Sequence, residues 1–143
     1  MTNNLLLGCG TMTLCLVIQC VVVAFLLRFT HGLQERGKIL PGVWHSSALL
    51  IAVVMIMFTG ILVQITIWAT LFMSCGEFQS FCNAFYHSAV NFTTLGYGDV
   101  VMSEQRRLLG ALEAANGVLM FGLTVSVMFA AVQALTRTTR QKG

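Results

Sequence analysis

Long apolar stretches alternate with short polar ones along the chain. Three of the apolar stretches, 5–27, 46–73 and 108–135, are free or almost free of charged residues. Each is long enough for the roughly 20 helical residues that cross about 30 Å of hydrocarbon. A fourth stretch, 78–92, is uncharged but would span only about 22 Å as a helix. The pattern predicts three membrane-spanning helices and one short helix that enters the membrane and turns back.

Composition supports a protein that lives in the lipid bilayer. Of its 143 residues, 57% are hydrophobic and only 9% are charged, and the mean hydropathy is +0.83. Soluble globular domains carry far more charge than this. We therefore expect an all-α membrane protein. The net charge of +3 follows from membrane topology and does not indicate a nucleic acid partner.

Basic residues predict which side of the membrane each loop occupies. Six of the eight Lys and Arg residues gather on one side: Arg28, Arg36, Lys38, Arg137, Arg140 and Lys142. Segments rich in Lys and Arg stay in the cytoplasm. The other side carries Glu77, Asp99, Glu104, Arg106 and Arg107. We expect a multi-pass cell membrane protein with its N-terminus outside, the re-entrant segment outside and its C-terminus in the cytoplasm.

A glycine-containing motif follows the short apolar stretch and reads Thr94-Leu95-Gly96-Tyr97-Gly98-Asp99. Glycine adopts positive φ at little cost, and Gly96 and Gly98 occupy alternate positions. The backbone can therefore switch hand at every second residue and turn successive carbonyls toward one axis, whereas an ordinary strand alternates them. A stack of carbonyl oxygens can replace the water shell of a potassium ion.

This motif and its context closely resemble the selectivity filter of the potassium channel pore-domain family. A spanning helix and a short uncharged helix precede it, and a spanning helix follows. The resemblance implies that backbone carbonyls bind K+, with the Thr94 hydroxyl at the innermost site and Asp99 at the outer mouth. Leu95 stands where the family usually has valine. The implied ion-coordinating residues are Thr94, Leu95, Gly96, Tyr97 and Gly98, with K+ bound at the first four.

One motif per chain supplies one quarter of each carbonyl ring, so the resemblance implies a homotetramer. It covers 46–135 as the pore domain, which follows an N-terminal helix and basic loop, 1–45, and precedes a short basic tail, 136–143. We expect a potassium-selective channel that is not an enzyme and needs no cofactor except the permeant ion. A non-conducting regulatory subunit and a nonselective cation pore are the alternatives.

Several residues are expected to support this filter. The Tyr97 ring should point away from the pore, against Tyr86 and His87 on the short helix. The well-known bacterial relatives place a glutamate behind the filter that bonds to the aspartate of the motif, and Val90 occupies that position here.

Glu113 is the only acidic side chain inside a predicted span, and an ionisable group there is expected to face protein and to have a function. We expect it to support the filter from behind, together with Asn91 and with Asn116 as a further candidate. The alternative is that it reaches toward the outer interface or pairs with Arg106 or Arg107.

The last predicted span carries candidates for a hinge and a gate. Gly117 and Gly122 resemble the glycines of the inner helix in bacterial potassium channels, where the first is the usual hinge. A small residue that permits close helix packing is the alternative. Phe121, Val125 and Phe129 recur every four residues on one face, which is expected to line the cavity. Phe129 is the gate candidate, and contact with lipid is its alternative.

The five cysteines lack the spacing of a metal site. Cys9, Cys15 and Cys20 fall in the first span, where they are expected to act as small apolar side chains. Cys75 and Cys82 both fall in the outer segment, and the sequence leaves open whether a disulfide joins them.

Overall fold

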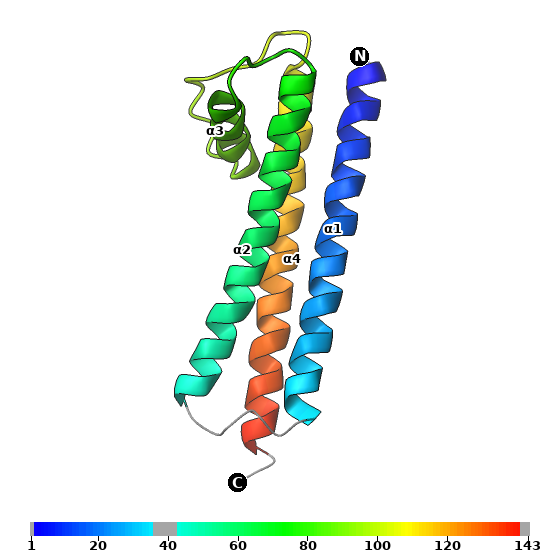
Figure 1. Cartoon of the computed structure of the whole chain (residues 1–143). Coiled ribbons are helices and arrows are strands. Elements are labelled where there is room, and N and C mark those ends of the chain that lie inside the picture. Colours follow the sequence, from blue (N-terminus) through cyan, green and yellow to red (C-terminus); the bar gives the residue numbers. More distant parts are fainter. Residues whose placement is uncertain (1, 36–42, 141–143) are drawn as a thin grey trace.

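The computed structural model describes residues 2–35 and 43–140, and every regular element in this part of the chain is a helix. Figure 1 shows the long helices side by side, with the short helix against their upper end. Arg36, Lys38 and Lys142 of the predicted cytoplasmic group lie outside the described residues. The four helices are α1 (Thr2–Glu35), α2 (Val43–Ser74), α3 (Phe81–Phe92) and α4 (Arg107–Arg140).

The predicted all-helical membrane fold is confirmed. Segments 2–28, 47–74 and 107–133 are long and apolar enough to cross a bilayer. The helices continue beyond the apolar residues, because helical hydrogen bonding does not stop where hydropathy changes. The short helix begins at Phe81 instead of Phe78. Phe78 lies in the irregular segment before the helix, where its ring packs on Phe72 and His87.

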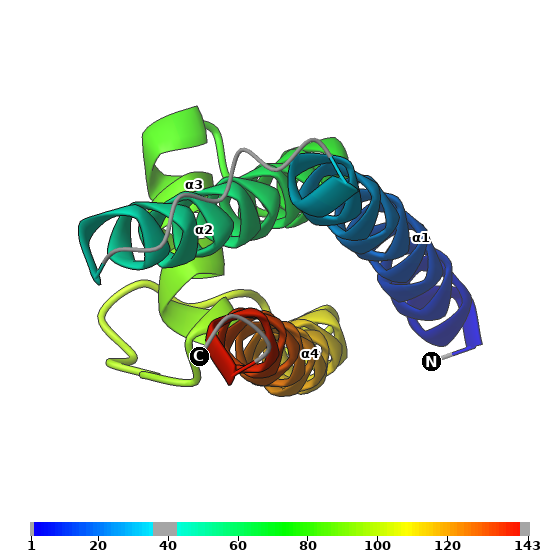
Figure 2. The same ribbon diagram turned by 90° about the horizontal axis from the view of Figure 1, so that it is seen from below.

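The short helix α3 and the N-terminal helix α1 lie on different sides of the α2–α4 pair. α3 contacts α2 and α4, and α1 also contacts α2 and α4. Figure 2 shows this arrangement from the end that carries the C-terminus. The N-terminus and α3 lie at the same end of the bundle (Figure 1). This placement agrees with the predicted order of crossings, while the side that faces the cytoplasm stays a prediction.

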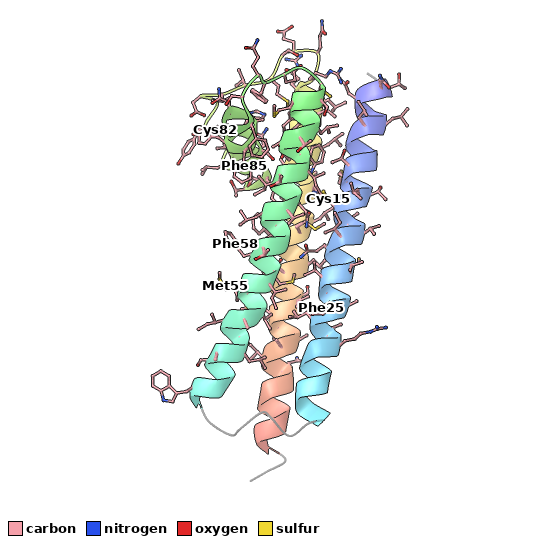
Figure 3. The ribbon with its side chains drawn as sticks, viewed as in Figure 1. Cys15, Phe25, Met55, Phe58, Cys82 and Phe85 are labelled. Atoms are coloured by element: carbon pink, nitrogen blue, oxygen red, sulfur yellow. The ribbon has the colours of Figure 1, made fainter. Side chains whose placement is uncertain are left out.

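The largest buried cluster lies where α3 meets the long helices. Trp68, Phe72, Phe92, Leu109 and Met120 are fully buried there. Many other apolar side chains along the long helices are exposed, including Phe25, and Met55 and Phe58 point outward from α2 (Figure 3). Outward-facing apolar side chains over this length suit contact with lipid.

Gly117 allows the backbones of α3 and α4 to touch. A Cβ atom at this position would lie 1.9 Å from the Phe92 carbonyl oxygen and 2.8 Å from the Phe92 carbonyl carbon. Those backbone atoms cannot move away without shifting α3. The geometry therefore favours the close-packing interpretation of Gly117. α4 runs unbroken through this position, and a hinge motion here stays a prediction.

We predict that Gly117→Ala destabilises the protein by about 1–3 kcal/mol, because the added methyl group forces α3 and α4 apart. Gly122→Ala is the matched control, since a Cβ atom there meets nothing within 4 Å. Alanine also favours a helix interior over glycine by about 0.5–1 kcal/mol. Thermal unfolding of each variant in detergent measures the difference. Equal melting temperatures for the two variants would contradict the packing role.

Candidate functional site

The backbone of the motif after α3 alternates between two conformations. Thr94, Gly96 and Gly98 have positive φ angles of 59°, 59° and 73°, whereas Leu95 and Tyr97 between them do not. The positive φ angles of the two glycines were predicted, but that of Thr94 was not. Residues 93–99 are all exposed in the single chain. A ring of carbonyl oxygens around a pore requires a backbone of this kind, which is exposed and has φ angles of alternating sign.

The inner end of this segment is held by the end of α3. The Val90 carbonyl accepts hydrogen bonds from the backbone N–H groups of Leu95 (3.0 Å) and Gly96 (3.4 Å), and Thr94 N–H donates to Asn91 O at 2.9 Å. The last carbonyls of a helix lack partners within the helix. Here the motif supplies their donors, and the same bonds hold Thr94 in a conformation that costs about 1–3 kcal/mol for a non-glycine residue.

Tyr86 holds the outer end of the motif. Its hydroxyl donates to Asp99 Oδ2 at 2.7 Å, and Val100 N–H donates to Asp99 Oδ1 at 3.0 Å. The bond from Tyr86 lowers the pKa of Asp99 below its ordinary value of 3.8 and raises the pKa of Tyr86 above 10.0. A carboxylate that accepts hydrogen bonds is favoured in its charged form.

The predicted packing of the Tyr97 ring on Tyr86 and His87 is not found among the described residues of the chain. The Tyr97 side chain is 67% exposed. The Tyr86 hydroxyl forms its hydrogen bond with Asp99, and His87 forms a hydrogen bond with the segment that follows the motif. Both predicted support residues therefore bond to the outer end of the motif, and Tyr97 lies within electrostatic reach of Tyr86 but stays mostly exposed within the chain.

His87 joins α3 to the segment after the motif. Its Nδ1 lies 2.7 Å from the Val100 carbonyl oxygen, and its Nε2 lies 2.8 Å from Asn91 Nδ2. A carbonyl only accepts, so Nδ1 carries the proton and Nε2 accepts from Asn91. The rings of Phe72 and Phe78 pack against the imidazole.

Glu113 is completely buried, which confirms that it faces protein. It forms a hydrogen bond with Ser88 of α3, and Asn91 also interacts with its carboxyl group. The alternative pairing with Arg106 is not formed, because Arg106 donates to Asn4 and Cys75. Ser88 was not predicted from the sequence. Its spacing of three residues from Asn91 was the available signal, since that spacing places both on one face of α3.

The comparison with known proteins agrees with this geometry. The family model described as "Ion channel" matches residues 56–134, which is more than half of the chain. The chain belongs to the ion channel family. The matched residues include α3, the glycine motif and most of α2 and α4, but not α1. No curated protein and no solved structure matches the chain.

Polar contacts connect the segments at the outer end of this channel protein. Both carboxylate oxygens of Glu77 accept from Ser103, one from its backbone N–H at 2.7 Å and one from its hydroxyl at 2.8 Å. Arg106 Nη1 lies 3.3 Å from both Asn4 Oδ1 and Cys75 Sγ. Cys75 and Cys82 are free thiols. Hydrogen bonds, and not a disulfide, thus connect the segments that surround the motif in this structure.

The gate candidates lie on a face of α4 that the single chain leaves uncovered. Val125 is 67% exposed and Phe129 is 64% exposed. Phe121 is partly covered, because its ring packs edge-on against Phe92 at the end of α3, with 6.2 Å between ring centroids. Gly122 is exposed on the same helix. The roles of these residues in lining the cavity and forming a gate stay predictions.

Side-chain ligands for a metal do not gather in the part of the chain that the structure describes. It contains no group of three or more His, Cys, Asp or Glu residues placed to hold a metal ion. The oxygens available to a cation at the motif are therefore backbone carbonyls, together with the Thr94 hydroxyl and the Asp99 carboxylate.

We predict that Tyr86→Phe raises the pKa of Asp99, because the variant keeps the ring and removes only the donating hydroxyl. In the wild type, the stabilisation from this bond is fully present above the ordinary pKa of 3.8 and disappears as the pH falls through the lower native value. The carboxyl carbon shift of Asp99, followed by NMR during an acid titration, reports the midpoint.

Ser103→Ala is the control for this titration, because Ser103 bonds to Glu77 and not to Asp99. It should leave the Asp99 midpoint where it is in the wild type. A Tyr86→Phe midpoint at or below the wild-type midpoint would show that the phenol does not stabilise the Asp99 carboxylate.

Proposed function

We propose that this ion channel protein is one subunit of a homotetrameric potassium channel, which conducts K+ passively through a central pore. The observation that carries the proposal is the alternation of positive and negative φ along Thr94-Leu95-Gly96-Tyr97-Gly98. Such alternation supports a backbone whose carbonyls converge on one axis. Residues Thr94, Leu95, Gly96 and Tyr97 would bind K+, and the Thr94 hydroxyl would add a ligand at the innermost site.

Exposure of the motif supports assembly around a central axis. Tyr97 is 67% exposed and Leu95 is 56% exposed in the single chain, although both are large apolar side chains. Val125 and Phe129 on α4 are similarly uncovered. Four chains related by cyclic symmetry would bury these side chains against one another and close the carbonyl rings. The Asp99 carboxylates would then form a ring at the outer mouth that attracts cations.

Support from behind the motif favours potassium selectivity over a nonselective pore. Tyr86 holds Asp99, His87 holds Val100, and α3 carbonyls hold Leu95 and Gly96. Glu113 bonds α4 to α3 one turn before the Gly117 contact. Because the motif is held at both ends, its carbonyl oxygens stay at a defined distance from one another. The pore can then bind ions of one size more strongly than ions of another size.

We predict that the purified chain, placed alone in lipid vesicles, passes K+ and excludes Na+. Gly96→Ala should abolish K+ flux, because alanine disfavours the φ of 59° that Gly96 adopts. A cation flux assay with K+ or Na+ gradients measures both. Gly10→Ala is the control, since Gly10 lies on α1 with nothing within 4 Å of an added Cβ.

Each outcome of the flux assay separates the proposal from its alternatives. Equal Na+ and K+ flux would indicate a nonselective pore. No flux from a well-folded tetramer would indicate a regulatory subunit that needs partner chains. Selective flux in Gly96→Ala equal to that of Gly10→Ala would contradict the assignment of the filter.

A further inference from the structure

Four polar side chains meet deep in the bundle, at a point where α1, α2 and α4 come together. Cys15, Trp68, Glu113 and Asn116 all have 0% exposure. The sulfur of Cys15 lies against the side chains of Asn116 and Trp68 and within electrostatic reach of Glu113. Figure 3 places Cys15 on the side of α1 that faces the other helices. We call these four residues the junction cluster.

Apart from these contacts with the Cys15 sulfur, which is a weak acceptor, most polar atoms of the junction cluster have no hydrogen-bond partner. Among the described residues, the buried side-chain atoms without a partner are Trp68 Nε1, Glu113 Oε2, Asn116 Nδ2, Asn116 Oδ1 and Gln64 Oε1. Four of these five atoms belong to the cluster. Buried polar groups in proteins almost always have a partner, either protein or ordered water. Unpartnered atoms gathered in one place therefore point to a partner that they share.

The hydrogen bonds of Ser88 determine whether Glu113 carries a proton, and therefore whether it can accept a hydrogen bond from that partner as a neutral group. The Ser88 hydroxyl lies 2.9 Å from the Ile65 carbonyl oxygen, which can only accept, and it also bonds to Glu113 Oε1. A hydroxyl has one proton to donate. Both contacts are satisfied when Ser88 donates to Ile65 and a protonated Glu113 donates to Ser88. Glu113 Oε2, which has no partner among the described residues, is then an uncharged acceptor.

We propose that the junction cluster is a binding site for internal water. The Trp68 indole N–H and the Asn116 amide N–H groups would donate to the water, which in turn would donate to Glu113 Oε2 and Asn116 Oδ1. A buried water makes about three hydrogen bonds, and the cluster offers two donor groups and two acceptors. Water satisfies both kinds of group at once, whereas an ion of either sign would satisfy only one kind.

The N-terminal helix α1 completes this site. Cys15 is the member of the cluster that α1 supplies, and one turn further along the same helix Gln19 Oε1 accepts from Gln64 Nε2 at 2.8 Å. α1 lies outside the residues that match the ion channel family. A role for this helix follows: it seals a hydrated polar site against lipid, and Glu113 connects that site to α3 through Ser88. This inference does not depend on potassium selectivity.

A water-to-indole NMR measurement tests the proposal without altering the cluster. Trp44 is 87% exposed at the far end of α2, so Trp44→Phe leaves Trp68 as the sole tryptophan. With 15N-labelled tryptophan in the full chain in lipid, we expect a cross-peak between the Trp68 indole proton and water. Absence of this cross-peak, with the indole resonance resolved, would overturn the proposal.

Two further variants in the Trp44→Phe background test the assigned partners. Asn116→Leu should reduce the water cross-peak at least severalfold, because it removes a donor and an acceptor. Thr59→Val is the control and should retain it, since Thr59 is exposed and bonds only to its own helix. An undiminished cross-peak in Asn116→Leu would refute the assignment of Asn116.

Infrared spectroscopy tests the proton on Glu113 separately. The full chain should show the carbonyl stretch of a protonated carboxyl group at neutral pH, and Glu113→Gln should remove it. If the full chain shows no such band, the proton placement is wrong.

Discussion

The helix α3 ends against α4, at the contact between Phe92 and Gly117, and the rest of the site depends on how the last polar groups of α3 are satisfied. Irregular backbone at membrane depth is tolerated only where protein or a water-filled cavity supplies its partners. The Val90 and Asn91 carbonyls accept from the motif that follows. Gly117 lets α4 approach the Phe92 carbonyl closely. Together these contacts place the start of the glycine motif at a defined depth beside α4.

Apolar length and glycine spacing were sufficient to predict the helices and the alternating backbone, because both depend on local chemistry. The positive φ of Thr94 was not predictable, since a β-branched residue disfavours it and only the bonds from α3 hold it there. The burial of Glu113 was predicted because lipid excludes a charged group. Its partner Ser88 depends on how α3 docks against α4, which no local pattern encodes.

The partner of Asp99 shows a similar limit. The sequence directed attention to an acidic partner on the short helix, and Val90 stands at that position. In the structure, the Tyr86 hydroxyl donates to Asp99 instead, so one phenol stabilises the carboxylate.

Polar pairing also connects α1 to the other helices through Gln19 and Gln64. Cys15, expected to be a small apolar side chain, lies among polar groups because three helices converge on it.

A potassium filter shared by four chains is tested most directly by a high-resolution structure of the assembled protein in lipid, determined in K+ and compared with one determined in Tl+. Such a filter requires four chains around one axis, with density on that axis between the carbonyl rings of Thr94 to Tyr97 and stronger scattering there in Tl+. Four chains whose motifs do not meet at a common axis, or an axis without ion density in either salt, would contradict it.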